Sequence, residues 1–189
     1  QLPHPIWPVF GPNMAYYADQ KPLGVFQLSA NSNNNPFGAL TLYMLGKLLW
    51  TPHADAEAIK NEFINLYYGP AAPYIKEFIL LSEQTLKESG IELSIYDTGG
   101  WITHAYVAAS EELFKRAFAV SDSDENRRRV DMAYLQVQFA ALACRPELSF
   151  TENSMTLKRP PSISAEEYLK RLVDLGAPDM GEHQPRDRI

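Results

Sequence analysis

The chain has few of the features that mark a membrane protein, a disulfide scaffold or a nucleic-acid-binding protein. It holds one cysteine, Cys144, which excludes an intramolecular disulfide. Its apolar runs stop well short of the roughly 20 residues that a membrane-spanning helix needs. Its formal net charge is -6, and the densest basic run is Arg127-Arg128-Arg129. Because phosphate binding needs clustered Lys and Arg, this charge argues against a nucleic-acid partner.

Motifs for cofactors and for common hydrolases are also missing. The sequence contains no Gly-x-Gly-x-x-Gly, Walker, Gly-x-Ser-x-Gly or Cys-x-x-Cys pattern. The histidines at positions 4, 53, 104 and 183 are scattered, and no pair has the spacing of metal ligands. We therefore expect neither a metal nor another cofactor.

The first 50 residues predict the end of a β/α barrel. Four prolines within residues 1–12 argue against a helix there, and Asn13 is expected to cap a short helix. Residues 24–30 have the β-branched and aromatic content of a buried strand. Asn35 and Pro36 then predict the start of a helix to residue 50, which is apolar on nearly every side and is therefore expected to be buried on more than one side. The chain opens with Gln1 rather than Met, so we expect the protein to begin upstream of it.

The remaining chain predicts amphipathic helices. They are expected from Asp55 to Gly69, over about 71–89, over about 103–120, from Ser123 to Pro146 and over 164–175. The third and fourth of these are joined by a short polar link, which predicts an antiparallel hairpin. Residues 147–163 lack periodicity and predict a loop, and a tail beyond Pro178 is expected to be poorly ordered.

Three polar side chains near the carboxyl end of the predicted strand are the first candidates for ligand contact. They are Gln27, Ser29 and Asn31. Barrels assemble their ligand sites at this end of the strands, and amide groups both donate and accept hydrogen bonds. The alternative for the Asn31–Asn35 cluster is that it satisfies loop and helix-cap hydrogen bonds.

Two sequence elements resemble a known family. One is Lys47-Leu48-Leu49-Trp50 followed by Pro52, and the other is Glu62-Phe63 followed by Tyr67-Tyr68-Gly69 and Ala71-Ala72. Together they resemble bacterial proteins that carry the domain of unknown function 4838, over about residues 10–120. The resemblance implies an exported carbohydrate-active protein, whose barrel is similar to those of glycoside hydrolase family 20 and the family 67 α-glucuronidases and is followed by a helical bundle.

In that context Trp101 is a further candidate for sugar binding. It follows Gly99-Gly100 and lies near Asp97 and His104, and a Trp ring can stack on a sugar. The alternative is that Trp101 anchors the start of a helix by packing. A glycosidase also needs two carboxylates across the scissile bond, yet no Asp or Glu lies between Asp19 and Asp55. We therefore expect no complete catalytic pair in this chain.

The sequence thus predicts a mainly α protein, a helical bundle that follows the last strand-helix unit of a (β/α) barrel. The expected divisions are 1–50 for the barrel end, 51–176 for the helical domain and 177–189 for a flexible tail. The expected function is to support the barrel of a glycoside-hydrolase-like protein and to add secondary contacts to its sugar, with the chain inactive on its own. The expected partners are an oligo- or polysaccharide and the rest of the parent barrel. The alternative is a non-catalytic helical module for protein interaction or scaffolding.

Overall fold

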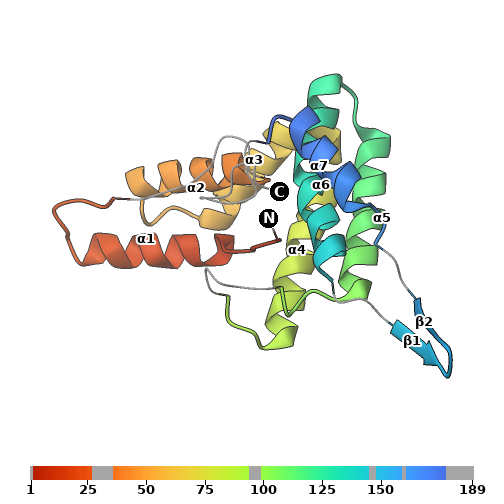
Figure 1. Ribbon diagram of the computed structural model, residues 1–189. Coiled ribbons are helices and arrows are strands. Elements are labelled where there is room, and N and C mark those ends of the chain that lie inside the picture. Colours follow the sequence, from red (N-terminus) through yellow and green to blue (C-terminus); the bar gives the residue numbers. More distant parts are fainter. Residues whose placement is uncertain (1, 27–35, 94–98, 145–147, 159–160, 178–189) are drawn as a thin grey trace.

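The fold, known from a computed structural model, is mainly helical, as the sequence predicts. The structure describes residues 2–26, 36–93, 99–144, 148–158 and 161–177. These residues form an N-terminal arm, a helical bundle and a short β-hairpin (Figure 1). In chain order the helices and strands are η1 (Trp7–Val9), α1 (Phe10–Asp19), α2 (Gly38–Trp50), α3 (Ala56–Tyr68), η3 (Gly69–Ala71), α4 (Ala72–Ser89), α5 (His104–Val120), α6 (Asp124–Ala143), β1 (Leu148–Thr151), β2 (Ser154–Leu157) and α7 (Ala165–Asp174).

The N-terminal arm, which we define as η1, α1 and α2, extends away from the bundle to the left of Figure 1. The prediction that residues 1–12 form no helix was wrong, because η1 and the first turn of α1 lie within them. Pro8 and Pro12 each fall in the first turn of a helix, where a backbone N–H has no partner within the helix and its loss costs little. Asn13 is therefore inside α1 and does not cap it.

The segment between α1 and α2 holds the predicted strand over residues 24–30. Its described part, 24–26, is not assigned to a strand, and residues 27–30 lie outside the described residues. Helix α2 begins at Gly38, and its N-cap is Phe37 rather than the predicted Asn35. Phe37 adopts the left-handed conformation with φ of 59°, and its side chain is buried.

Helices α3 to α6 form the bundle, and their ends lie close to those that the sequence predicts. Asp55, Thr103 and Ser123 each cap a helix by accepting a hydrogen bond from the backbone N–H three residues later. Only residues 121–123 separate α5 from α6, and the two helices lie side by side in Figure 1, as predicted for a hairpin. Residues of the arm and of the bundle share one hydrophobic core.

Helix α7 packs on α6 through a second, smaller core that includes Leu135, Tyr168 and Leu172. The region 147–163 is not a loop throughout, because β1 and β2 pair there as an antiparallel hairpin with Ser149 opposite Thr156. The signal was an alternation of apolar and hydroxyl residues with a period of two, around the turn at 152–153.

The N-terminus of α7 carries the capping box that the sequence predicts. The Ser164 hydroxyl accepts from the Glu167 N–H, and the Glu167 carboxylate accepts from the Ser164 N–H at 3.0 Å. The hydrogen bonds that the Ser164 N–H and the Ser164 hydroxyl donate to this carboxylate hold the pKa of Glu167 below its usual value. A lowered pKa in the folded state stabilises the fold above the unfolded pKa, and this contribution disappears as the pH falls through the folded value.

We therefore expect Glu167→Gln to lower the melting temperature at pH 7 and to have a smaller effect at a strongly acidic pH, because protonation of the wild-type carboxyl removes the charged acceptor as the pH falls through its lowered pKa. Thermal unfolding followed by circular dichroism at both pH values tests this expectation. Glu166→Gln is the matched control, because Glu166 lies in the same first turn but outside the capping box. An equal effect of Glu167→Gln at both pH values would contradict the assignment.

Candidate functional site

The predicted ligand residues near residue 30 cannot be placed. Gln27, Ser29 and Asn31 lie outside the described residues, and so does Asp97. Their proposed contacts to a ligand therefore remain predictions.

Trp101 is buried at the centre of the chain's main core rather than displayed on the surface. Its side chain is 2% exposed, and its ring meets that of Tyr106 edge-on at 5.1 Å between centroids. The Tyr106 hydroxyl in turn lies 2.8 Å from that of Ser82, and burial raises the pKa of Tyr106 to about 12. The indole therefore anchors the start of α5, which is the alternative that the sequence left open. In this conformation a sugar has no access to its face.

Several carboxylates of the bundle have evident structural partners. Glu62 pairs with Lys47 of the arm, and Glu77 pairs with Arg116 of α5. The ammonium of Lys60, 6% exposed, lies between Glu57 at 2.8 Å and Glu83 at 3.2 Å. The pairs Lys47–Glu62, Lys60–Glu83 and Arg116–Glu77 each join two neighbouring helices, which gives these carboxylates a structural role.

Two further kinds of site receive no support from the described part of the chain. No group of three or more His, Cys, Asp or Glu side chains is arranged to hold a metal ion among the described residues. Within the same residues, no helix is both long enough and apolar enough to cross a membrane.

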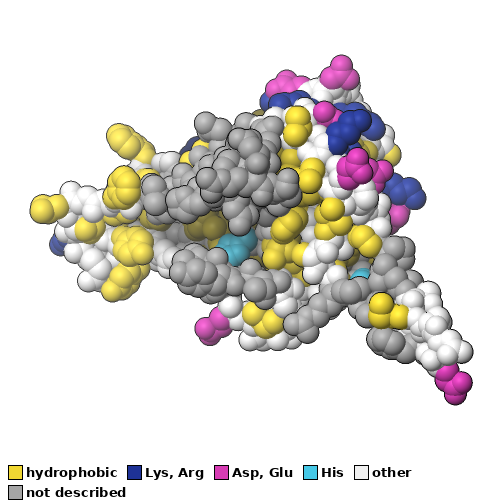
Figure 2. All heavy atoms as spheres, in the orientation of Figure 1, with side chains coloured by type: hydrophobic (Ala, Val, Ile, Leu, Met, Phe, Trp, Pro, Cys, Tyr) yellow, Lys and Arg dark blue, Asp and Glu magenta, His cyan; other side chains and the backbone are white. Residues whose placement is uncertain are grey.

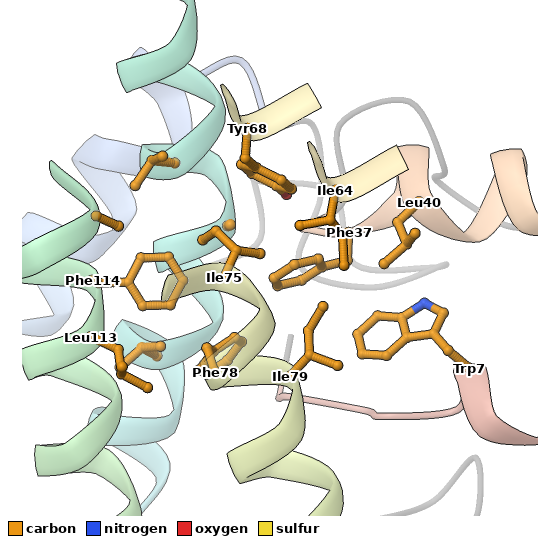
Figure 3. Close-up of a cluster of buried hydrophobic side chains, with 14 of the residues drawn as sticks. Trp7, Phe37, Leu40, Ile64, Tyr68, Ile75, Phe78, Ile79, Leu113 and Phe114 are labelled. Atoms are coloured by element: carbon orange, nitrogen blue, oxygen red, sulfur yellow. The ribbon is translucent and has the colours of Figure 1, made fainter. Parts of the chain in front are cut away.

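The arm is joined to the bundle by a cluster of aromatic rings (Figure 3). Phe37 stacks on Phe78 of α4 at 5.8 Å between centroids and meets Trp7 of η1 edge-on at 5.4 Å. Trp7 also donates from Nε1 to the hydroxyl of Thr41 in α2, at 3.3 Å. The beginnings of η1 and of α2 are therefore fixed to one point on the bundle.

Beyond this aromatic cluster, one face of α2 is covered by other residues of the chain and the opposite face is exposed. We call the exposed face the open face of α2. Leu40, Met44 and Leu48 are fully buried. The open face carries Leu42, Gly46, Leu49 and Trp50, with Trp50 88% exposed. These positions follow the spacing i, i+4, i+7 and i+8, which places them on one side of a helix. A Cβ atom added at Gly46 would meet nothing within 4 Å, so another backbone has room to approach closely.

Exposed apolar side chains continue along the rest of the arm and the segment that links its helices. They are Val9, Tyr16, Tyr17, Leu23, Val25 and Phe26. Scattered exposed apolar residues are normal on a protein surface, whereas a contiguous group marks a surface that contacts something else. Among the described residues, the sequence-based prediction that α2 is buried on more than one side holds for one side only.

Charged side chains are scarce on the same surface. Of the 40 Asp, Glu, Lys and Arg residues in the chain, only Asp19, Lys21 and Lys47 precede Thr51. Lys47 turns toward Glu62 of α3, and hydrogen bonds with Tyr43 and Glu62 raise its pKa. Figure 2 shows hydrophobic side chains with few charged ones over the arm, whereas charged side chains gather over α5, α6 and α7. The open face of α2 and the exposed apolar side chains of the rest of the arm together make up what we call the open face of the arm. This surface is the clearest candidate functional surface. Its sequence signals are the spacing of Leu42, Leu49 and Trp50 and the lack of charge.

A comparison with known families gives one match. The sequence model of the family described as "Domain of unknown function (DUF4838)" matches residues 1–80. This match confirms the predicted resemblance to that family, over a segment that includes the arm, α3 and the first half of α4. No curated protein and no solved structure matches the chain.

The burial of Trp101 leads to a direct test of its role. Truncating a fully buried Trp leaves a cavity and typically costs about 3–5 kcal/mol. We therefore expect Trp101→Ala to lower the free energy of unfolding by about that amount, measured by urea denaturation. Trp50→Ala is the matched control, because its indole is 88% exposed and its loss is expected to change stability by less than about 0.5 kcal/mol. A loss of stability from Trp50→Ala as large as that from Trp101→Ala would contradict this placement.

Proposed function

We propose that this chain is the helical C-terminal portion of a glycoside-hydrolase-like, carbohydrate-active protein, and that the open face of its arm packs against the barrel of that protein. The observation that carries the proposal is the number of large exposed apolar side chains on α1, α2 and the segment between them, together with the scarcity of charge there. The carbohydrate link itself comes from the sequence resemblance, which also leads us to propose an exported bacterial parent.

The chemistry of the open face fits a permanent contact within one protein. Burying the Leu49 and Trp50 side chains against a partner removes apolar surface from water, and each large side chain contributes about 1.5–3 kcal/mol when fully buried. Permanent interfaces resemble a domain core in their low charge. The family match supports the proposal because the arm belongs to the matched segment.

Under this proposal the chain has a supporting role and the catalytic carboxylates belong to the barrel. Gln27, Ser29 and Asn31 lie between α1 and α2 in the sequence. They are proposed to add polar contacts at the edge of a sugar site. Trp101 is left out of that site because its ring is buried.

The double variant Leu49→Ser/Trp50→Ser tests the packing. Both side chains are exposed in this chain, so we expect the isolated 189-residue chain to lose less than about 1 kcal/mol of stability. In the parent protein the same variant should lose several-fold more, because it there removes buried contacts. Thermal and urea unfolding of both proteins measure the difference.

Val173→Ser serves as the control, because Val173 is 54% exposed on α7, outside the arm. It should have a small effect in both proteins. An equally small effect of the arm variant in both would overturn the packing against a barrel. If the arm variant were neutral in the parent but abolished binding to a separate protein, the scaffolding alternative would be correct.

The supporting role has its own test. We expect the parent protein to hydrolyse aryl glycosides or glucuronides and the isolated chain to show no turnover above background. Release of the chromophore under matched protein concentrations measures both. Turnover by the isolated chain would show that it holds a complete catalytic pair and would overturn the proposal.

A further inference from the structure

A small polar groove lies between α5, α6 and α7, away from the arm. Its volume is about 360 Å³. Helix α5 supplies Glu111, Lys115 and Phe118, and α6 supplies Arg127, Asp131 and Tyr134, while Arg171 comes from α7. Both triplets follow the spacing i, i+4 and i+7, so each lies along one side of its helix and the two sides face each other across the hairpin. This shared spacing is a signal in the sequence that the helix predictions alone did not reveal.

Aromatic rings form the apolar part of the groove. The Phe118 and Tyr134 rings meet edge-on at 5.7 Å between centroids, and Phe114 supports Tyr134 from the core at 5.2 Å. The guanidinium of Arg127 lies over the Phe118 ring, 5.3 Å from its centroid. Burial and the nearby Glu111 raise the pKa of Tyr134, so its hydroxyl stays protonated and is able to donate a hydrogen bond.

One cation of the groove is fixed in place by its neighbours. Arg171 donates from Nε to the side-chain oxygen of Gln138 at 3.0 Å and pairs with Asp131 through Nη2. Gln138 is 5% exposed, so the guanidinium is held by a buried partner from α6. Its charge and that of Asp131 offset each other.

The other two cations, Arg127 and Lys115, are held by fewer hydrogen bonds and ion pairs than Arg171. Among the described residues, no carboxylate lies within 4.0 Å of the Arg127 guanidinium, and Lys115 pairs only with the exposed Glu112 at 3.7 Å. Glu111 accepts a hydrogen bond from Ser162. Three cations and two carboxylates therefore line the groove, which gives it one positive charge in excess on a chain of net charge -6.

We propose that this groove binds a small hydroxylated carboxylic acid, whose carboxylate pairs with Arg127 and Lys115 and whose hydroxyl groups bond to Glu111 and Tyr134. The volume lies at the lower end of the range for small-molecule sites, which suits a ligand the size of a monosaccharide. A guanidinium matches the geometry of a carboxylate, and the single charge of one carboxylate balances the one positive charge in excess. The arm takes no part in the groove, so this inference stands independently of the proposed function.

The test is a titration of the 189-residue chain with gluconate, glucose and glucose 6-phosphate at low salt. Binding is followed by calorimetry and by shifts of backbone amide signals in NMR spectra. We expect gluconate to bind with a Kd in the millimolar range or tighter, with shifts concentrated on α5, α6 and α7. Glucose should bind at least ten-fold more weakly because it lacks the carboxylate. Raising the salt concentration should weaken gluconate binding, since the contacts are between exposed charges.

Arg127→Gln and Lys115→Gln should each weaken gluconate binding by about ten-fold while leaving the melting temperature nearly unchanged. Arg116→Gln is the matched control, because Arg116 lies next to Lys115 in sequence but pairs with Glu77 on another side of α5. It should leave binding unchanged. Absence of gluconate binding, binding of glucose 6-phosphate alone, or equal losses in Arg116→Gln would each overturn the assignment.

Discussion

The contact between Phe37 and Phe78 determines how the arm sits on the rest of the chain. Phe37 takes a left-handed backbone conformation that bulky residues rarely adopt, and this turns α2 away from the bundle while the ring itself points inward. Trp7 packs on the same ring from the start of η1. One buried aromatic residue thus lets two helices project while their bases stay in the common core.

This arrangement explains why the arm is covered on one side only. The inward side chains of α2 reach the shared core, but the helix extends past the bundle, and the side that carries Leu49 and Trp50 meets no other described part of the chain. An α-helix that is apolar all round normally has neighbours on several sides. The composition of α2 therefore matches a more enclosed environment than the one it has here, which is the physical basis for assigning it a partner.

The helices of the bundle were predictable because their signals are local. A capping side chain such as Asp55 or Ser123, an apolar stripe and a terminating Gly or Pro all lie within one helix. The start of α2 was not predictable, because Asn35-Pro36 has the form of a helix start while the backbone of Phe37 is set by tertiary packing on Phe78. The open face of α2 was missed for the same reason, since an apolar sequence does not indicate which sides are covered.

The candidate sites also show that local sequence signals do not reveal which side chains the fold buries or brings together. Trp101 follows two glycines, a context that suggests an exposed ring. Its ring is buried in the core instead, because burying so large a side chain against Tyr106 is strongly favourable. Glu111, Lys115, Arg127 and Asp131 have the sequence context of solvated helix surface. They form a groove only because α5 and α6 are antiparallel neighbours, which brings two ordinary polar stripes to face each other. For the groove the decisive factor is the pairing of α5 with α6, and that pairing depends on contacts between residues far apart in the chain.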